Sequence, residues 1–331
     1  MILTRRKVPK ELLHFRALDA RSDLNMRQRK KLESLEKGYA GEVLYDSLYD
    51  EVLSHLYVFR DIYLKIENST IQFDSLIVYD EGFIVNEIKN FQGIYSYENE
   101  QWYVRQNEIS EDPIIQLKRA SNNLIKFKYL YNEIFSVEGK VIFPNIEFVL
   151  ETEHPTVGDY VIMRHQLRRY LFSLKNFTAG TRTEALSKIV QNHIVENPYF
   201  DYCADFTKLR KGVYCRSCNS FNTKKIKFHF QCRDCNHKDT IHTIIVQALS
   251  DFSILFDSHL LNRKNLWNFL DGQISYATLN RYLSKYCDYI ITKNIRYYSF
   301  KYYDFDQAVS SEIRSWRYKD MPVVSKLRIY K

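Results

Sequence analysis

The sequence predicts an α/β sandwich in its longer N-terminal part, followed by a small metal-binding module and a C-terminal region of helices and strands. Three observations lead to this prediction. Apolar β runs alternate with helical segments as far as Asn197. Four cysteines then occur as two C-x-x-C pairs. The remaining chain has two short helical patterns followed by aromatic-rich runs that are typical of strands.

Length and charge distribution limit the classes of protein that fit. With 331 residues, of which 45% are hydrophobic, the chain can form two or three domains with real cores. Residues 201–331 contain 22 Lys and Arg against 12 Asp and Glu, a net charge of +10, whereas residues 1–200 carry a net −2. This asymmetry is typical of a near-neutral catalytic part joined to a polyanion-binding part; an evenly solvated, lysine-rich surface is the alternative.

Neither a membrane segment nor a secretion signal is expected. The sequence has no run of about 18 or more apolar residues. Its N-terminal segment, MILTRRKVPKELLHF, lacks an apolar core and a cleavage site. We therefore expect a cytoplasmic protein, in which the six cysteines are metal ligands or buried thiols and not disulfides.

The elements of the sandwich follow in chain order. A helical stretch from Leu24 to Leu56 follows the cap candidates Ser22 and Asp23. Gly38 and Gly41 either interrupt this helix or mark the close approach of a neighbouring backbone. Strands are expected at Ile71–Tyr79, Phe83–Asn90, Gly93–Tyr97, Trp102–Val104, near Val141–Leu150 and near Asp159–Met163, with helices at Pro113–Phe135 and near residues 165–174 and 182–195.

A β-hairpin around the turn signal Asp80–Gly82 would bring three reactive side chains together. Glu87 and Lys89 are two residues apart, so they share one face of the second strand. A two-residue loop at Glu81 and Gly82 pairs Asp74 with Lys89, which puts Asp74 on the same face. A loop one residue longer would put Asp74 on the opposite face.

Two carboxylates beside a lysine suit Mg²⁺ or Mn²⁺, because magnesium prefers carboxylates together with phosphate oxygens and water. Such a cation lowers the pKa of a bound water and neutralises charge on a phosphate. Lys89 could orient the attacking water or stabilise the anionic transition state, and the carbonyl of Ile88 could face the metal. The alternative is an E-x-K ion pair on a surface strand, which Asp74 on the same face makes less favourable.

The order of these residues resembles the NERD, or nuclease-related, domain, a family of the PD-(D/E)xK nuclease superfamily. The resemblance covers residues 38–150 and rests on Gly38-x-x-Gly41-Glu42, Asp74 in a β run, Glu87-Ile88-Lys89-Asn90, Gly93 and Asp112-Pro113-x-x-Gln116. It implies a restriction-endonuclease-like α/β sandwich. It also implies that Glu42 is a helix-borne acidic residue near the metal, that Asp74 and Glu87 are its main ligands, that Lys89 is the catalytic lysine, and that Gln116 lies near the site or the DNA backbone.

Two positions depart from the pattern of that family. Asp112 stands where many members have Asn, which should be tolerated because both residues cap helices and Pro113 suits the first turn. Asn86 precedes the E-x-K motif at a position that is often apolar, and we expect it to mark a half-exposed face.

The two cysteine pairs predict a structural zinc site. Cys215 and Cys218 are separated from Cys232 and Cys235 by 13 residues, a spacing typical of a tetrahedral zinc ribbon. Redox dithiols or ordinary buried thiols are the alternatives. Asn219 and Asn236 follow the two pairs, where a left-handed backbone is often required. We expect the ribbon to contact phosphates through exposed cations, namely Lys224, Lys225 and Lys227.

The C-terminal region is typical of a winged-helix-like domain. A helix at Asn265–Leu270 ends near Gly272, and Ser275 can cap a second helix at Tyr276–Tyr286. The strands expected on either side of Lys293-Asn294 could form the wing. We expect Asn280, Arg281 and Lys285 to face DNA; the alternative is a generic helical cap with a polar face.

Together these patterns predict a metal-dependent nuclease that hydrolyses DNA in preference to RNA and has no membrane partner. We expect four segments: a basic or helical arm at 1–37, the NERD domain at 38–197, the zinc ribbon at 198–240 and the winged-helix-like domain at 241–331. The alternatives are a non-cleaving DNA-binding regulatory protein with a NERD fold, and a scaffold that uses the ribbon for protein contacts. The resemblance makes a role in defence against mobile elements, or in repair, plausible. The oligomeric state does not follow from the sequence.

Overall fold

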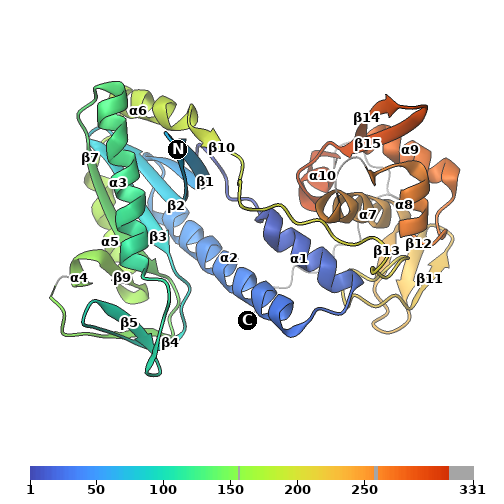
Figure 1. Cartoon of the computed structure of the whole chain (residues 1–331), viewed down its shortest axis with the longest axis horizontal. Helices are drawn as coiled ribbons and strands as arrows, with labels where there is room; N and C mark the ends of the chain where they lie inside the picture. The colour runs from blue at the N-terminus through green and yellow to red at the C-terminus, as the bar shows by residue number, and fades with distance from the viewer. Residues whose placement is uncertain (156, 257–259, 313–331) are drawn as a thin grey trace. The chain divides into compact units, whose positions relative to one another are not determined.

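The structure, a computed structural model, describes residues 1–155, 157–256 and 260–312 (Figure 1). The chain divides into two units. The first comprises Met1–Val8 and Glu33–Phe200, and the second comprises Pro9–Leu32 and the chain from Asp201 onward. The N-terminal segment 1–37 is therefore not a separate arm: its first eight residues belong to the first unit and most of the others to the second.

A six-stranded mixed sheet forms the centre of the first unit. Its strand order is β10-β1-β2-β3-β7-β9. The pairs β3–β7 and β7–β9 are parallel, and the remaining pairs are antiparallel. The strands span Tyr57–Ile66 (β1), Ser69–Tyr79 (β2), Gly82–Ile88 (β3), Ser136–Phe143 (β7), Val161–Met163 (β9) and Ile194–Val195 (β10).

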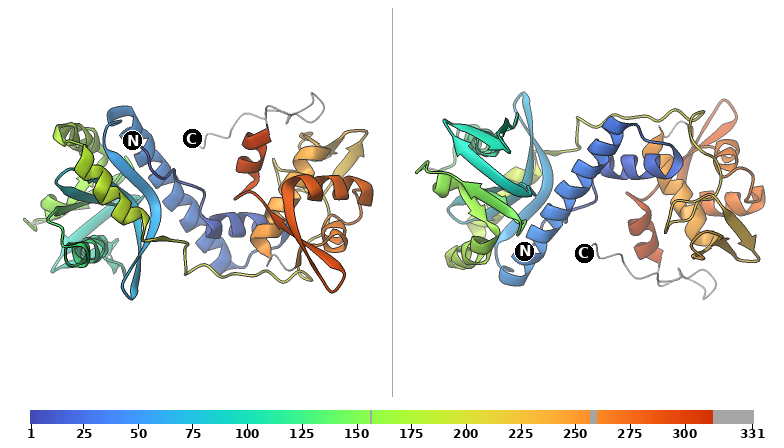
Figure 2. Two further views of the ribbon diagram at one scale, coloured as in Figure 1. Left: turned by 90° about the horizontal axis from the view of Figure 1, so that it is seen from above. Right: turned by 90° about the horizontal axis from the view of Figure 1, so that it is seen from below.

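Helices cover both faces of this sheet and confirm the predicted α/β sandwich (Figures 1 and 2). Buried side chains of α3 and α6 pack into the core on one face, and those of α2 and α5 into the core on the other. The same unit contains a second sheet, of order β6-β5-β4-β8. These elements span Met26–Val52 (α2), Gly93–Glu98 (β4), Gln101–Val104 (β5), Asn107–Glu108 (β6), Pro113–Tyr131 (α3), Phe148–Glu151 (β8), Val157–Tyr160 (α4), Arg164–Ser173 (α5), Leu174–Asn176 (η1) and Thr181–Gln191 (α6).

Helix α2 runs without a break through both of its glycines. The predicted alternative of an interruption is therefore wrong, and a close approach accounts for Gly41. A Cβ atom at Gly41 would lie 2.4 Å from the Cβ of Asn90. The Asn90 amide also donates to the carbonyl of Lys37 at 2.8 Å, so a side chain that follows β3, and not a backbone, packs on the helix.

The hairpin register differs by two residues from the prediction. Tyr79 pairs with Gly82, and Ser75 with Asn86, so the turn is made by Asp80 and Glu81. The carboxylate of Asp80 accepts a hydrogen bond from the backbone amide of Gly180 at 2.7 Å and thereby helps to begin α6, which removes Asp80 from strand pairing. Because the shift is even, every side chain keeps its predicted face.

The second unit contains the predicted metal module and the winged-helix-like elements. Its core is built around α7, whose side chains Ile245, Leu249 and Phe252 are fully buried. The elements span Lys10–Arg21 (α1), Thr223–Ile226 (β11), His229–Cys232 (β12), Lys238–Thr240 (β13), Ile241–Leu255 (α7), Arg263–Phe269 (α8), Tyr276–Tyr286 (α9), Cys287–Thr292 (β14), Ile295–Phe300 (β15) and Phe305–Glu312 (α10). Within the described ranges, none of these or the earlier helices has the length and apolarity needed to cross a bilayer.

Helix α1 lies in the segment that was expected to be a basic or helical arm, but its buried residues make it part of the second unit. Leu12 is 0% exposed. The guanidinium of Arg21 lies 3.3 Å from the Asp251 carboxylate of α7 and 3.7 Å from the ring centre of Phe269. A buried ion pair of this kind is strongly destabilised when one partner is removed, so α1 is an integral part of the unit.

Candidate active site and metal centre

Four of the residues proposed for catalysis lie on adjoining elements of the first unit. Glu42 comes from α2, Asp74 from β2, and Glu87 and Lys89 from the end of β3. The ammonium of Lys89 lies 3.0 Å from Oε1 of Glu87. One carboxylate oxygen of Asp74 accepts a hydrogen bond from the backbone amide of Ile88 at 2.8 Å. The continued register places Asp74 opposite Glu87, and not opposite Lys89 as predicted.

The surroundings of Glu42, Glu87 and Lys89 favour their protonated forms. Burial, and after it the charge of Asp74, raises the pKa of both Glu42 and Glu87. Burial opposes the charge on Lys89, but Glu87 and Asp74 outweigh it and the pKa of Lys89 lies above its ordinary value. The part of the two glutamate shifts that comes from the negative charge of Asp74 would be offset by a bound cation.

Arg6 is a member of this cluster that the sequence pattern did not predict. Its guanidinium donates to Oε2 of Glu42 at 2.6 Å, to Oδ2 of Asp46 at 2.8 Å and to the backbone carbonyl of Asp74 at 2.7 Å. The side chain is 3% exposed. No local signal marks this arginine, because all three of its partners are at least 36 residues away along the chain.

The carboxylates surround Asp74 but do not converge tightly. Among the described residues, possible metal ligands gather within 4.8 Å of one another at the four cysteines, and not at these carboxylates. The hydrogen bonds among the described residues leave one oxygen each of Glu42, Asp74 and Glu87 unengaged. Carboxylate oxygens are donors that Mg²⁺ prefers, but direct binding of all three to one ion would require them to lie closer together than they do here.

Gln116 begins the second turn of α3 and bonds to an acidic neighbour. Its amide donates to Glu111 at 3.0 Å, and its own carbonyl oxygen is buried without a hydrogen-bond partner among the described residues. Asp112 caps α3 as expected, accepting from the amide of Ile114 at 2.7 Å. The charge of Glu111, two residues before α3, also contributes to the raised pKa of Glu87.

Asn86 is fully buried, so the expectation that it marks a half-exposed face is wrong. Its amide donates to the hydroxyl of Tyr45 on α2 at 2.7 Å, and its carbonyl accepts from the hydroxyl of Tyr170 on α5 at 2.8 Å. The polar side chain is tolerated because both of its functional groups have partners. Asn86 therefore ties both helices of this face to the strand that carries Glu87.

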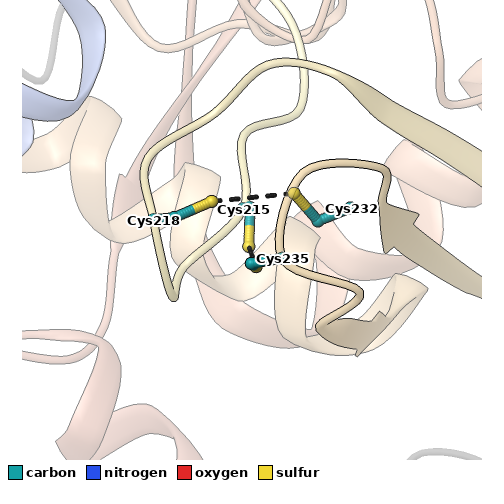
Figure 3. Close-up of side chains that lie close together, drawn as sticks. All are labelled: Cys215, Cys218, Cys232 and Cys235. Atoms are coloured by element: carbon teal, nitrogen blue, oxygen red, sulfur yellow. Dashed lines mark hydrogen bonds between the residues drawn. The ribbon is translucent and has the colours of Figure 1, made fainter.

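The four cysteines come together as a second, separate centre (Figure 3). Sγ of Cys215 lies 3.5 Å from Sγ of Cys235, and Sγ of Cys218 lies 3.6 Å from Sγ of Cys232. A tetrahedral zinc with bonds of about 2.3 Å requires sulfur separations of about 3.8 Å. The cluster is thus compatible with a structural zinc ion.

The loops that carry the cysteines have the backbone geometry of zinc knuckles. Asn219 and Asn236 have φ angles of 57° and 59°, which confirms the predicted left-handed positions. After the first pair the chain turns back, with the amide of Cys215 bonded to the carbonyl of Ser220 at 2.8 Å. The strands β11, β12 and β13 form the antiparallel ribbon of this module.

The residues proposed for DNA contact lie on the ribbon and on α9. Lys224, Lys225 and Lys227 are exposed on or next to β11. On α9, Leu279 and Leu283 are 0% exposed; Arg281 and Lys285 face the solvent, and Asn280 is half-buried. Ser275 caps this helix through the amide of Thr278 at 3.3 Å. The hydrophobic face of α9 is thus confirmed, and its cations are accessible.

The division into units sharpens the charge asymmetry of the sequence. The second unit includes the basic segment Pro9–Leu32, so it contains 29 Lys and Arg against 15 Asp and Glu, a net charge of +14. The first unit then carries 19 against 25, a net charge of −6. The two units are therefore suited to different tasks, because a polyanion is attracted by one and repelled by the other.

Comparison with protein families identifies the domain around the carboxylate cluster. Residues 37–144 match the family model NERD, described as the nuclease-related domain. The matched range includes Glu42, Asp74, Glu87, Lys89 and Gln116 and ends before the cysteines. No curated protein and no solved structure gave a match to the chain.

Proposed function

Since residues 37–144 form a nuclease-related domain, we propose that the protein is a divalent-metal-dependent nuclease that hydrolyses phosphodiester bonds in DNA. The observation that carries this proposal is the cluster of Glu42, Asp74, Glu87 and Lys89 on three adjoining elements of that domain. Two carboxylates and a lysine held on paired strands are costly to bury without a function or a cation.

The cation would be held by Asp74 and Glu87, with Glu42 and the carbonyl of Ile88 as further oxygen donors. Mg²⁺ or Mn²⁺ fits because the unengaged donors are carboxylate oxygens. When bound, such a cation supplies positive charge at the phosphate and makes water more acidic.

The protein's own side chains and main chain then position the reacting groups. Lys89 holds its ammonium beside Glu87 at 3.0 Å, where it can donate to a phosphate oxygen and stabilise the charge that develops during hydrolysis. The amide of Ile88 fixes the Asp74 carboxylate. The amide of Gln116, which donates to Glu111 at 3.0 Å, would bind the DNA backbone.

DNA binding is assigned mainly to the second unit. The exposed Lys224, Lys225 and Lys227 would contact phosphates, while Asn280, Arg281 and Lys285 of α9 would contact phosphates or base edges. A zinc ion at the four cysteines would hold the ribbon in shape. Its role would be structural, because four thiolates leave no open position for catalysis. We place the protein in the cytoplasm, because its six cysteines form no disulfide and four of them are arranged to bind zinc.

A second candidate function is a non-cleaving DNA-binding protein. The observation in its favour is the spacing of the carboxylates, because among the described residues no three of them bring their oxygens within 4.8 Å of one another. A site whose carboxylates cannot approach further would not hold a catalytic cation.

Cleavage assays distinguish the two candidates. Purified protein is incubated with supercoiled, linear and single-stranded DNA in the presence of Mg²⁺, Mn²⁺ or EDTA. The nuclease hypothesis expects cleavage that EDTA abolishes and that is absent from Asp74→Ala prepared in the same way. DNA binding without metal-dependent cleavage would support the second candidate and contradict the first.

A further inference from the structure

We propose that Arg6 is a positioning residue of the nuclease site, which holds the Glu42 carboxylate beside Asp74. The inference rests on the proposed nuclease function and extends the functional site beyond residues 37–144. Arg6 touches two residues of the cluster from different elements, since it donates to the side chain of Glu42 at 2.6 Å and to the main chain of Asp74 at 2.7 Å. It thus sets the distance between α2 and β2 at the point where both contribute a carboxylate.

The backbone around Arg6 is fixed by the central sheet. Ile2 forms a parallel bridge with Val58 of β1, and the amide of Leu3 donates to the Val58 carbonyl at 2.9 Å. Next along the chain, the hydroxyl of Thr4 accepts from the amide of Arg60 at 2.8 Å. The segment before Arg6 is therefore held against β1, so the guanidinium enters the cluster from a rigid support.

Asp46 and Glu42, both on α2, differ in how many of their carboxylate oxygens are bonded. Asp46 has both carboxylate oxygens engaged, Oδ2 by Arg6 at 2.8 Å and Oδ1 by Arg60 at 3.2 Å. Glu42 has only Oε2 engaged, so its other oxygen remains available. A planar guanidinium with several donors can hold both acids at once, which a lysine cannot do. Arg6 therefore leaves Glu42, and not Asp46, as the acid that α2 offers to a cation.

Removal of Arg6 should displace Glu42. The carboxylates of Glu42, Asp46 and Asp74 repel one another, as the contributions of Asp74 and Asp46 to the raised pKa of Glu42 indicate. Without the Arg6 guanidinium, this repulsion would push the Glu42 side chain away from Asp74. Partners that orient a metal ligand in this way typically contribute 10–100-fold to metal affinity.

Arg60 provides a matched control. It is equally buried, with 5% of its side chain exposed, and it forms ion pairs with the same Asp46 and with Asp50. It has no hydrogen bond or ion pair with Glu42 or Asp74 among the described residues. Arg60→Ala should therefore destabilise the fold as Arg6→Ala does, but leave the geometry of Glu42 unchanged.

Mn²⁺ binding to the full-length, zinc-loaded chain tests the proposal by calorimetric titration, with thermal unfolding of each variant as a check on folding. We expect Arg6→Ala to weaken Mn²⁺ binding by about 10–100-fold, Arg6→Lys to weaken it less, and Arg60→Ala to leave it unchanged. In a Glu42→Gln background, Arg6→Ala should cause no further loss, because both changes remove the same ligand.

The outcomes separate this proposal from the function on which it rests. If Mn²⁺ binds Asp74→Ala as tightly as the unchanged protein, the cluster holds no cation, and both the nuclease site and the role of Arg6 are refuted. If Asp74→Ala loses the metal but Arg6→Ala binds it as tightly or more tightly, only the role of Arg6 is refuted. Should Arg6→Ala not fold, wild-type affinity in Arg6→Lys refutes that role equally, because one ammonium cannot replace the guanidinium fork.

Discussion

DNA binding by the second unit should depend steeply on salt concentration, because affinity for a polyanion comes largely from the release of counterions by clustered cations. Five exposed cations are proposed to contact phosphates, namely Lys224, Lys225, Lys227, Arg281 and Lys285. If each contacts one phosphate of duplex DNA, a plot of log affinity against log salt has a slope of about −4.5. Affinity then falls by about 500-fold between about 50 and about 200 mM salt.

Substitution of the three ribbon lysines tests their share of that slope. Replacement of all three, Lys224, Lys225 and Lys227, by Ala should reduce its magnitude by about 2.7, because each phosphate contact contributes about 0.9. Fluorescence anisotropy of a labelled duplex across a salt series measures the slope directly. The control is Lys65→Ala, which removes one exposed lysine from β1 of the first unit and should leave the slope unchanged.

Two results would refute this assignment of DNA binding. An unchanged slope in the triple variant, with a steep slope in the parent, would mean that the ribbon does not contact phosphates. A slope that falls in Lys65→Ala but not in the triple variant would move the binding surface to the first unit, and the ribbon would become a candidate for protein contacts.

Three further predictions concern the first unit and the cysteines. Lys89→Ala should lower the cleavage rate by about 10²–10³-fold while DNA binding survives, as for loss of one donor to a developing anion, and Lys65→Ala should cleave normally; a normal rate in Lys89→Ala would rule out the proposed lysine. Elemental analysis of protein purified without chelator should find one zinc per chain, and a chelator should unfold the ribbon locally; no zinc would contradict the assignment. Asn86→Ala should lower the free energy of unfolding by about 2–6 kcal/mol, since it leaves two buried tyrosine hydroxyls without a partner at about 1–3 kcal/mol each; urea unfolding that shows a loss below about 1 kcal/mol would mean that water replaces the amide.

Features with a local cause could be predicted from the sequence. Helix α9 begins at Tyr276 and ends at Tyr286 as expected, because Ser275 supplies the cap and two leucines mark the buried face. The turn of the last hairpin lies at Lys293 and Asn294, whose φ angles are both positive. The four cysteine sulfurs lie within 4.8 Å of one another, as their paired C-x-x-C spacing predicted. In each case the determining residues lie within a short stretch of the chain.

Features set by distant contacts could not be predicted in this way. Asn86 was expected on a half-exposed face. Its burial could not be foreseen, because the tyrosines that bond to it come from α2 and α5. The hairpin register depended on Asp80, whose carboxylate bonds to residues about 100 positions later in the chain. Arg6 lies in a segment without periodicity, and its role depends on three acceptors in α2 and β2. Hydrophobic patterns identify which face is buried, but they do not identify the partner of a buried polar group.

The discontinuity of the second unit connects the fold with the charge distribution. The chain enters this unit at Pro9, leaves it after Leu32 and returns at Asp201, and the first passage supplies both a buried helix and seven Lys and Arg. A fragment that begins near Pro198 would lose Leu12 from the core and leave the Asp251 carboxylate without Arg21, while a fragment that ends at Asn197 would expose the buried face of α1. Since an unpaired buried charge is strongly destabilising, neither fragment is expected to fold as the corresponding unit does in the whole chain. Cleavage and DNA binding are therefore better separated by substitutions such as Asp74→Ala and the ribbon variant in the full chain, where both cores remain complete.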